Sequence, residues 1–273
     1  MNIIFYLETP MLTIKKSLAL GAIALGLSFG ASAKDWKEIR VAIDPTYKPF
    51  TYKTDDGKPT GFDVDVAQAL CDELKAKCVF VEQLWDSMIP GLQARKYDAI
   101  ISSMSITADR EKVVAFTGKY YNTPSQVVLN KNIKTDGSPA SLKGKKLGVL
   151  KGSTQEKYAK GELAKAGVEI LSYDAQDQVY LDIKAGRLDG TVADVIEVKG
   201  GFLDTADGKD YVFVGKTLGS YVNYFGKGAG IAVRKQDKEL RTAWDNGIKT
   251  LRKNGQWQKI SDKYFAGTDI WGD

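Results

Sequence analysis

The chain has 273 residues, with 39 lysines and arginines against 34 aspartates and glutamates, for a net charge of +5. The charges are scattered and form no long runs, so the composition predicts a soluble protein with no footprint for nucleic acid. Histidine is absent, which excludes Ser-His and Cys-His nucleophilic catalysis and the common zinc sites. We expect neither a metal nor a cofactor.

The N-terminus has the pattern of a secretory signal peptide over residues 1–33. Lys15 and Lys16 precede an uncharged run, and Ala-Ser-Ala then ends at Ala33 with small residues at the two positions that a signal peptidase reads. We expect cleavage after Ala33, with Met11 as the more ordinary start of such a signal. No later segment reaches about 18 consecutive apolar residues, so we expect no membrane insertion of the mature chain.

The first part of the mature chain alternates strand and helix, as open α/β sheets do. Asp86 has the pattern of a helix N-cap, with Pro90 in the first turn after it. The expected elements are a strand at 39–43, a helix beginning at 61–63, a strand at 79–81, a helix after Asp86 and a strand at 97–106.

A second α/β unit follows a break near residues 122–125. We expect strands at 126–129, 146–150, 169–172, 189–193 and 211–214, with helices at 154–165 and 178–185. After a glycine- and tyrosine-rich connector at 219–230 come a strand at 231–234 and a long helical region at 238–265. Late apolar segments of this kind often return to complete the first unit, which would give two lobes with a cleft between them.

The two cysteines, Cys71 and Cys78, lie seven positions apart. In an exported chain this spacing is typical of one local disulfide. Two free, partly buried thiols are the alternative.

Residues 98–110 carry a concentration of polar groups directly after a buried strand. Ala99 to Ile101 has the pattern of that strand, and Ser102, Ser103 and Ser105 supply donors and acceptors where it ends. Ligands of open α/β sheets bind at such ends. Arg110 carries a planar fork that can hold a carboxylate. The segment therefore suits a free amino acid, whereas the alternative is a polar loop followed by a solvated helix.

Several short motifs occur in order from Ile39 to the C-terminus. They are Asp-Pro-Thr-Tyr-Lys-Pro-Phe at 44–50, Gly-Phe-Asp-Val-Asp at 61–65, Trp-Asp-Ser-Met-Ile-Pro-Gly-Leu at 85–92, Ser-Ser-Met-Ser-Ile-Thr at 102–107 with Arg110, Gly-Ser-Thr at 152–154, Leu-Arg-Lys-Asn-Gly-Gln-Trp at 251–257 and Lys-Tyr-Phe at 263–265. This set resembles the periplasmic substrate-binding proteins of ABC importers for polar amino acids, and most closely the lysine/arginine/ornithine- and histidine-binding group. The Cys71 and Cys78 pair also matches the disulfide of that group.

The resemblance implies a two-lobed α/β fold in which each lobe is an open sheet flanked by helices, with two crossover strands at the hinge. Lobe 1 would comprise residues 34–121 and 229–273, lobe 2 residues 125–218, and the hinge crossings residues 122–124 and 219–228. It also implies a monomeric periplasmic protein that delivers its ligand to an inner-membrane ABC permease.

The resemblance assigns partners to the two α-groups of an amino acid. Arg110, with backbone N–H groups near Ser105 and Thr154, would clamp the α-carboxylate. Asp194, with acceptors at Ser103, would hold the α-ammonium. Asp194 follows an expected strand, so it could instead only cap the next helix.

The resemblance also assigns contacts to the ligand side chain. Asp44 and Ser102 would meet its far end, Tyr47 and Trp85 would sandwich its stem, and Leu150 would line the face of lobe 2. Asp44 could instead be only a turn residue, and the two aromatics could be ordinary half-buried side chains. Lys151, which follows Leu150, stands where related binders often carry glutamine.

Counting charges favours a cationic ligand. Arg110 contributes +1 and Asp44 and Asp194 contribute −1 each, so the expected pocket has a net charge of −1. Arginine, lysine or ornithine would neutralise it, whereas a neutral amino acid would leave a buried carboxylate unpaired. We therefore expect a binding protein for a cationic L-amino acid and not an enzyme. The alternatives are a binder of histidine, glutamine or an opine, and a periplasmic dehydratase on the same fold.

Overall fold

The computed structural model describes residues 36–219 and 221–272. The expected signal peptide and its cleavage site at Ala33 lie outside the described residues. None of the helices in the described ranges has the length and apolar character needed to cross a membrane.

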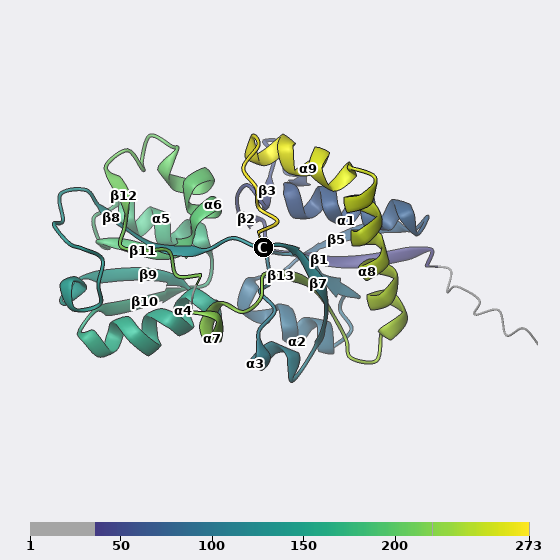
Figure 1. Ribbon diagram of the computed structural model, residues 1–273, viewed down its shortest axis with the longest axis horizontal. Coiled ribbons are helices and arrows are strands. Elements are labelled where there is room, and N and C mark those ends of the chain that lie inside the picture. Colours follow the sequence, from purple (N-terminus) through teal and green to yellow (C-terminus); the bar gives the residue numbers. More distant parts are fainter. Residues whose placement is uncertain (1–35, 220, 273) are drawn as a thin grey trace, which may run out of the picture. The chain divides into compact units, whose positions relative to one another are not determined.

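The first lobe is built on a five-stranded sheet with the order β5-β1-β6-β13-β7. Its strands are β5 (Lys77–Glu82), β1 (Glu38–Ile43), β6 (Ala99–Ile100), β13 (Ala229–Val233) and β7 (Ala115–Tyr121). Strand β1 runs parallel to β5 and β6, whereas β13 runs antiparallel to β6 and β7. The late strand β13 thus lies inside the sheet made by the early part of the chain (Figure 1).

Helices cover both faces of the first sheet. On one face, side chains of α1 (Phe62–Glu73), α8 (Lys238–Lys253) and α9 (Gln256–Phe265) pack with Val41 and Ile231. On the other face, α2 (Met88–Gln93) packs with Ala42 and Ile100. Neighbouring strand residues such as Val41 and Ala42 point to opposite faces, so both must be apolar.

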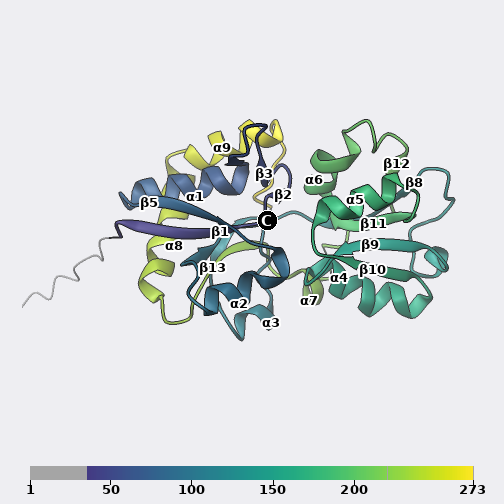
Figure 2. The same ribbon diagram turned by 180° about the vertical axis from the view of Figure 1, so that it is seen from behind.

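The second lobe is built on a five-stranded sheet with the order β10-β9-β11-β8-β12 (Figure 2). Its strands are β10 (Glu169–Tyr173), β9 (Lys146–Leu150), β11 (Gly190–Asp194), β8 (Ser125–Asn130) and β12 (Tyr211–Val214). Its helices include α4 (Thr154–Tyr158), α5 (Gln176–Lys184) and α6 (Val195–Val198). Helix α4 continues into a π turn at Ala159–Leu163 and a 3-10 turn at Ala164–Ala166.

The chain crosses between the two sheets twice. The first crossing lies between β7 and β8, and the second lies between β12 and β13 and contains helix α7 (Val222–Phe225). The first is anchored by Asn122, whose N–H donates to the Ile270 carbonyl at 2.7 Å. The fold is therefore a two-lobed α/β fold, and the residue boundaries of the lobes stay a prediction.

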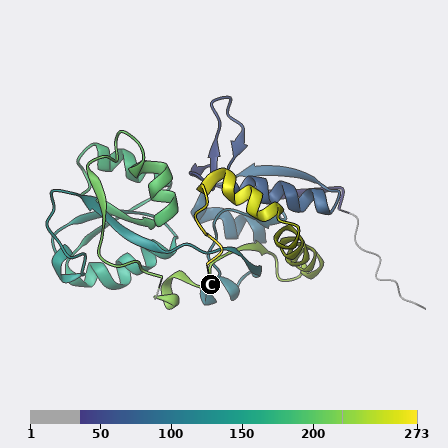
Figure 3. The ribbon, with the colours of Figure 1, turned by 45° about the horizontal axis from the view of Figure 1, so that its top comes forward.

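A third, small sheet extends from the first lobe. Strands β2 (Thr46–Tyr47), β3 (Thr51–Lys53) and β4 (Pro59–Thr60) pair antiparallel in that order. It forms the narrow hairpin that projects from the body in Figure 3. Because β2 begins two residues after Asp44, this hairpin fixes where Tyr47 lies.

Two local predictions were wrong. Strand β6 covers only Ala99–Ile100 and not 97–106, because the backbone leaves the extended region at Ser103, where φ is +56°. Asp86 does not cap a helix, because it lies inside a 3-10 turn at Trp85–Ser87 that precedes α2. The expected helical region at 238–265 is confirmed and consists of two helices, α8 and α9, which are separated at Gly255, where φ is +79°.

The predicted disulfide is confirmed. Cys71 of α1 and Cys78 of β5 are joined, with an S–S distance of 2.07 Å. The bond ties the end of helix α1 to the edge strand of the first sheet.

Reduction of this disulfide should lower the free energy of unfolding by about 2.5 kcal/mol, the chain-entropy value for so short a loop. Urea unfolding of the protein with and without reductant measures the change, and mass spectrometry after alkylation verifies the redox state. An unfolding midpoint that does not move on full reduction would contradict this expectation.

Candidate ligand-binding site

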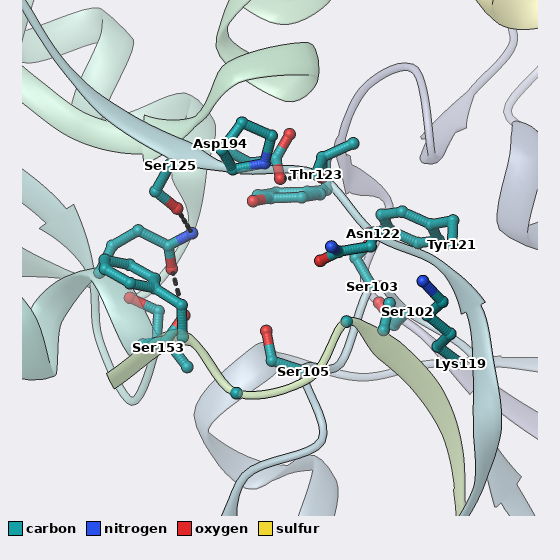
Figure 4. A pocket seen from close by; sticks show the side chains of 18 of the residues that line it. Ser102, Ser103, Ser105, Lys119, Tyr121, Asn122, Thr123, Ser125, Ser153 and Asp194 are labelled. Atoms are coloured by element: carbon teal, nitrogen blue, oxygen red, sulfur yellow. Dashed lines mark hydrogen bonds between the residues drawn. The ribbon is translucent and has the colours of Figure 1, made fainter. Parts of the chain in front are cut away.

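A cavity of about 410 Å³ lies between the two lobes and is lined by residues of both. Figure 4 shows side chains of this lining pointing toward a common space. The structure brings all ten residues predicted to bind the ligand to this cavity. They are Asp44, Tyr47, Trp85, Ser102, Ser103, Ser105, Arg110, Leu150, Thr154 and Asp194.

Five of these ten residues lie where the strands of the two main sheets end. Asp44 follows β1, Ser102 and Ser103 come just after β6, Leu150 ends β9 and Asp194 ends β11. Parallel strands deliver their carboxyl ends to one edge of a sheet, so polar residues placed there gather around one space.

Sequence reasoning missed the part of the lining that the crossings supply. Asn122, Thr123 and Pro124 line the cavity from the first crossing, next to Lys119 and Tyr121 at the end of β7, and residues 225–228 line it from the second. The signal was available, because a segment that joins two lobes must border the space between them.

Arg110 directs its guanidinium into the cavity from the short helix α3 (Ala108–Glu111). Its Nη1 donates to the Ser105 carbonyl at 2.9 Å and its Nη2 to the Gly152 carbonyl at 3.3 Å. The guanidinium carbon lies 5.2 Å from the Trp85 ring centroid. Burial lowers the pKa of Arg110 to about 10, so it stays charged at neutral pH. The solvated-helix alternative therefore fits the exposed Asp109 but not Arg110.

Asp194 both caps a helix and lines the cavity. Its Oδ1 accepts from the Ile196 N–H at 2.9 Å and the Glu197 N–H at 3.1 Å, which makes it the N-cap of α6. Its Oδ2 accepts from the Thr123 hydroxyl on the first crossing. Burial raises the pKa of Asp194 to about 6. Asp194 therefore caps the helix, as the alternative interpretation expected, and it also lines the cavity.

Ser103 is oriented by a buried carboxyl group beneath it. Its Oγ donates to Asp63 Oδ2 at 3.0 Å, and Asp63 Oδ1 accepts from the Tyr120 hydroxyl at 2.8 Å. Asp63 is fully buried, and burial raises its pKa to about 7. Because the Ser103 hydroxyl donates its hydrogen to Asp63, the Ser103 oxygen can act only as an acceptor toward the cavity.

Asp44 joins the ends of two strands. Its N–H donates to Ser102 Oγ at 3.0 Å, and its Oδ1 accepts from the Thr46 N–H at 3.1 Å and the Thr46 hydroxyl at 2.8 Å. The turn alternative therefore holds for Oδ1. The side chain is only 3% exposed and lines the cavity, and burial raises its pKa.

Helix α4 begins at the cavity. Ser153 is its N-cap and accepts from the Glu156 N–H at 3.0 Å. Thr154, the first helical residue, lines the cavity, and the first N–H groups of a helix have no partner inside it. Backbone N–H groups of the second lobe therefore border the same cavity as Arg110 of the first lobe.

Within the two described ranges, no group of three histidine, cysteine, aspartate or glutamate side chains could hold a metal ion. The cavity has instead two buried carboxylates, from Asp44 and Asp194, and the guanidinium of Arg110. Its lining also contains Lys119, whose Nζ donates to the Gly272 carbonyl, and the exposed Lys227.

Residues 39–267 match the family described as bacterial extracellular solute-binding proteins, family 3. The chain belongs to this family. The predicted resemblance is confirmed. The chain is 49% identical over 260 residues to the L-arginine-binding protein of Pseudomonas aeruginosa, covering 95% of this chain and 99% of the relative. It is 41% identical over 261 residues to the histidine-binding periplasmic protein of Salmonella typhimurium, covering 94% and 99%.

Solved structures support the same placement of this family 3 protein. An ancestral arginine-binding protein bound to arginine superposes with a TM-score of 0.78 at 33% identity, covering 85% of this chain and 100% of that one. The predicted fold class, a two-lobed periplasmic binding protein fold, is therefore confirmed. These relatives carry the names of binding proteins and not of enzymes.

Proposed function

We propose that the protein binds a cationic L-amino acid, arginine, lysine or ornithine, in the cavity between its lobes and delivers it to an inner-membrane ABC permease. The observation that carries this proposal is the pair of buried carboxylates in the cavity, Asp44 and Asp194, which face one arginine, Arg110. Of the two lysines in the lining, Lys119 donates to the Gly272 carbonyl and Lys227 is exposed. A ligand with one net positive charge leaves every one of these buried groups paired. The names of the arginine-binding relatives support the same ligand class.

The α-carboxylate is held by Arg110 and by backbone N–H groups at Ser105 and Thr154. The Arg110 fork is held by carbonyls of both lobes, at Ser105 and Gly152. A fork fixed in this way loses little freedom when it binds a carboxylate, and two charge-assisted bonds form at once.

The α-ammonium is held by Asp194 and by the oxygen of Ser103. Asp194 is negative where a helix N-terminus and the Thr123 hydroxyl stabilise that charge. Ser103 faces it from the first lobe as an acceptor, because its hydrogen goes to Asp63.

The side chain of the ligand extends toward Asp44 and Ser102, with Tyr47 and Trp85 along its stem and Leu150 on the face of the second lobe. The aromatic faces would add about 0.5 to 2 kcal/mol to binding of a cation through cation–π contact. The α-carboxylate pairs with Arg110 and the α-ammonium with Asp194. A guanidinium or ammonium at the end of the ligand side chain would then pair with the remaining negative charge, that of Asp44.

Closure of the lobes follows from this division of contacts. Arg110, Asp44 and Trp85 belong to the first lobe, whereas Asp194 and Thr154 belong to the second. Only a closed form completes both sets, so the ligand shifts the equilibrium toward closure. In this proposal residues 34–121 with 229–273 and residues 125–218 move as units about the crossings at 122–124 and 219–228.

Delivery to a permease requires export. We propose that the chain is exported to the periplasm, that its signal peptide is cleaved after Ala33, and that the mature protein acts as a monomer. The family of extracellular solute-binding proteins supports this location.

Two alternatives give different outcomes in the same assays. A binder of histidine, glutamine or an opine has the support of the histidine-binding relative, but a neutral ligand leaves one carboxylate unpaired. A dehydratase needs a positioned general acid. Asp44 and Asp194 instead accept hydrogen bonds from Thr46 and Thr123, which suits carboxylates that hold cations.

A thermal-shift screen with the twenty amino acids, ornithine, citrulline and octopine tests the proposal. A true ligand at 1,000 times its dissociation constant should stabilise the protein by roughly 4 kcal/mol, and X-ray scattering should show a smaller radius of gyration. Thermal shifts confined to histidine, glutamine or octopine would contradict the proposed class of cationic ligands. Turnover of prephenate would contradict the proposed binding function and indicate a dehydratase.

Asp44→Asn should change selectivity more than affinity for the α-groups. The substitution keeps the shape and removes the charge, so arginine and lysine should lose roughly 2 kcal/mol or more, the scale of a charge-assisted hydrogen bond. Citrulline should lose less or gain. Calorimetry at one salt concentration gives the arginine to citrulline ratio in both proteins. A ratio that does not move would make Asp44 only the turn residue that its bonds to Thr46 describe.

A further inference from the structure

Charged side chains meet across the edge of the cavity, from one lobe to the other. Asp86 lies in the 3-10 turn of the first lobe and Lys151 follows β9 in the second, with Lys151 Nζ 2.8 Å from Asp86 Oδ2. Asp109 of α3 and Lys157 of α4 form a second ion pair between the lobes. We call these two contacts the cross-lobe pairs. In both, the acid belongs to the first lobe and the lysine to the second.

The cross-lobe pairs lie next to the residues proposed to enclose the ligand. Asp86 follows Trp85, and Lys151 follows Leu150, both of which line the cavity. Gly152 lets the two lobes approach here, since a Cβ on it would lie 2.8 Å from Asp86 Oδ1 and its φ is +74°. Arg110 Nη2 adds a bond to the Gly152 carbonyl at 3.3 Å. Separation of the lobes would break all of these contacts together.

We propose that the cross-lobe pairs stabilise the closed form, so that Lys151 and Lys157 are positioning residues that set how long the ligand stays bound without touching it. This inference rests on the proposed binding function. Because the pairs exist only when the lobes meet, their loss should raise the dissociation rate constant and leave association with the open form unchanged.

The environment of each pair sets the size of the effect. The four side chains are 46–57% exposed, so each pair should be worth only a few-fold in affinity and should weaken with salt. Each pair also has a neighbour in its own lobe, because Asp174 lies 3.8 Å from Lys151 and Lys112 lies 2.8 Å from Asp109. Hydrogen bonding to Lys112 and Lys157 lowers the pKa of Asp109 to about 2, so this pair stays charged at neutral pH.

Stopped-flow kinetics with arginine at 20 mM salt test the inference. Lys151→Gln and Lys157→Gln should each raise the dissociation rate constant about two- to five-fold, whereas the association rate constant should rise only by the gain in open form without ligand. Lys160→Gln is the matched control, because Lys160 is an equally exposed lysine that pairs with Glu156 inside the second lobe at 2.6 Å. Dissociation from the Lys151 and Lys157 variants as slow as from the control would overturn the inference.

A double-mutant cycle separates pairing from a general loss of charge. Arginine should dissociate from the Asp86→Asn, Lys151→Gln variant no faster than from either single variant. The first substitution already breaks the ion pair, so the second has no further interaction to remove. Effects that multiply in the double variant would show that the two side chains act independently, and would overturn the pairing.

A ligand-free arm keeps this test apart from the test of function. The variant Lys96→Cys, Lys165→Cys has one cysteine at an exposed position of each lobe. These two cysteines can carry a pair of dyes because the native cysteines are bonded to each other. The closed fraction should fall between 20 and 500 mM salt in the parent and less in the Lys151→Gln, Lys157→Gln variant. The same salt dependence in both would overturn the inference. If the parent binds no cationic amino acid, the proposed function fails while this measurement still reports on the pairs.

Discussion

Replacing Arg110 with alanine is expected to weaken binding of every amino-acid ligand by about 2 to 5 kcal/mol, or about 30-fold to several thousand-fold in dissociation constant. The guanidinium enters the cavity with its two ends on the Ser105 and Gly152 carbonyls. Its removal leaves the α-carboxylate of any ligand without a charged partner, so arginine, lysine and ornithine should lose affinity alike.

Arg110→Lys provides the control for charge. It keeps a cation and loses the planar fork, so it should recover only part of the affinity. Calorimetry of the two variants with arginine and lysine measures both losses. Near-normal binding by Arg110→Ala would return Arg110 to the solvated surface of α3 and remove the anchor from the proposal.

Arginine binding is expected to weaken as the pH falls through about 6, because the α-ammonium needs an ionised Asp194. Burial raises the pKa of this carboxyl to about 6 in the free protein, so below that pH the ligand must displace a proton. Affinity should be constant above about pH 7 and fall about tenfold per pH unit well below 6, the dependence of one coupled proton. Calorimetry from pH 4.5 to 8 checks this slope.

Asp194→Asn should weaken arginine binding by about 2 to 5 kcal/mol and abolish the pH dependence of the affinity.

The effect of Asp194→Asn on the stability of the ligand-free protein should differ from its effect on binding. An acid whose pKa is raised by folding stabilises the folded state below its folded pKa and loses that contribution as the pH rises through about 4 to 6. The ligand-free variant should therefore unfold at a urea concentration no lower than the parent at pH 7. Tight binding by Asp194→Asn would leave Asp194 only as the cap of α6.

The cost of keeping Asp194 ionised without ligand is one physical reason for a coupled closure. The residue accepts from two N–H groups and the Thr123 hydroxyl, and burial still raises its pKa. A bound ammonium group would supply the missing positive charge. Ligand binding and lobe closure would then stabilise the same carboxylate.

Much of the fold could be predicted because its strands are runs of buried apolar residues bounded by polar ones. The expected strand at 146–150 is β9 without change, and the expected strand at 211–214 is β12. That Asp44, Ser102 and Asp194 line the cavity could be predicted because they follow such runs, where ligands of open sheets bind. The motifs then assigned a role to each of them.

Other features depend on conformation or on contacts between distant segments. Strand β6 ends at Ile100, and Ser103 has a left-handed φ of +56°. Serines after an apolar run do not indicate either feature. Asp86 has the sequence pattern of a helix cap, yet its partner is Lys151 of the other lobe. No local pattern connects two side chains that meet only when the lobes do.

The central claim is that the cavity selects a positively charged amino acid, and titration of the unmodified protein with L-arginine and L-citrulline tests it most directly. The two ligands have nearly the same shape and differ in the charge at the end of the side chain. At pH 7.5 arginine should bind about 30-fold more tightly or better, which corresponds to roughly 2 kcal/mol for a charge-assisted hydrogen bond. Citrulline binding as tightly as arginine, or no heat from either ligand, would contradict the account.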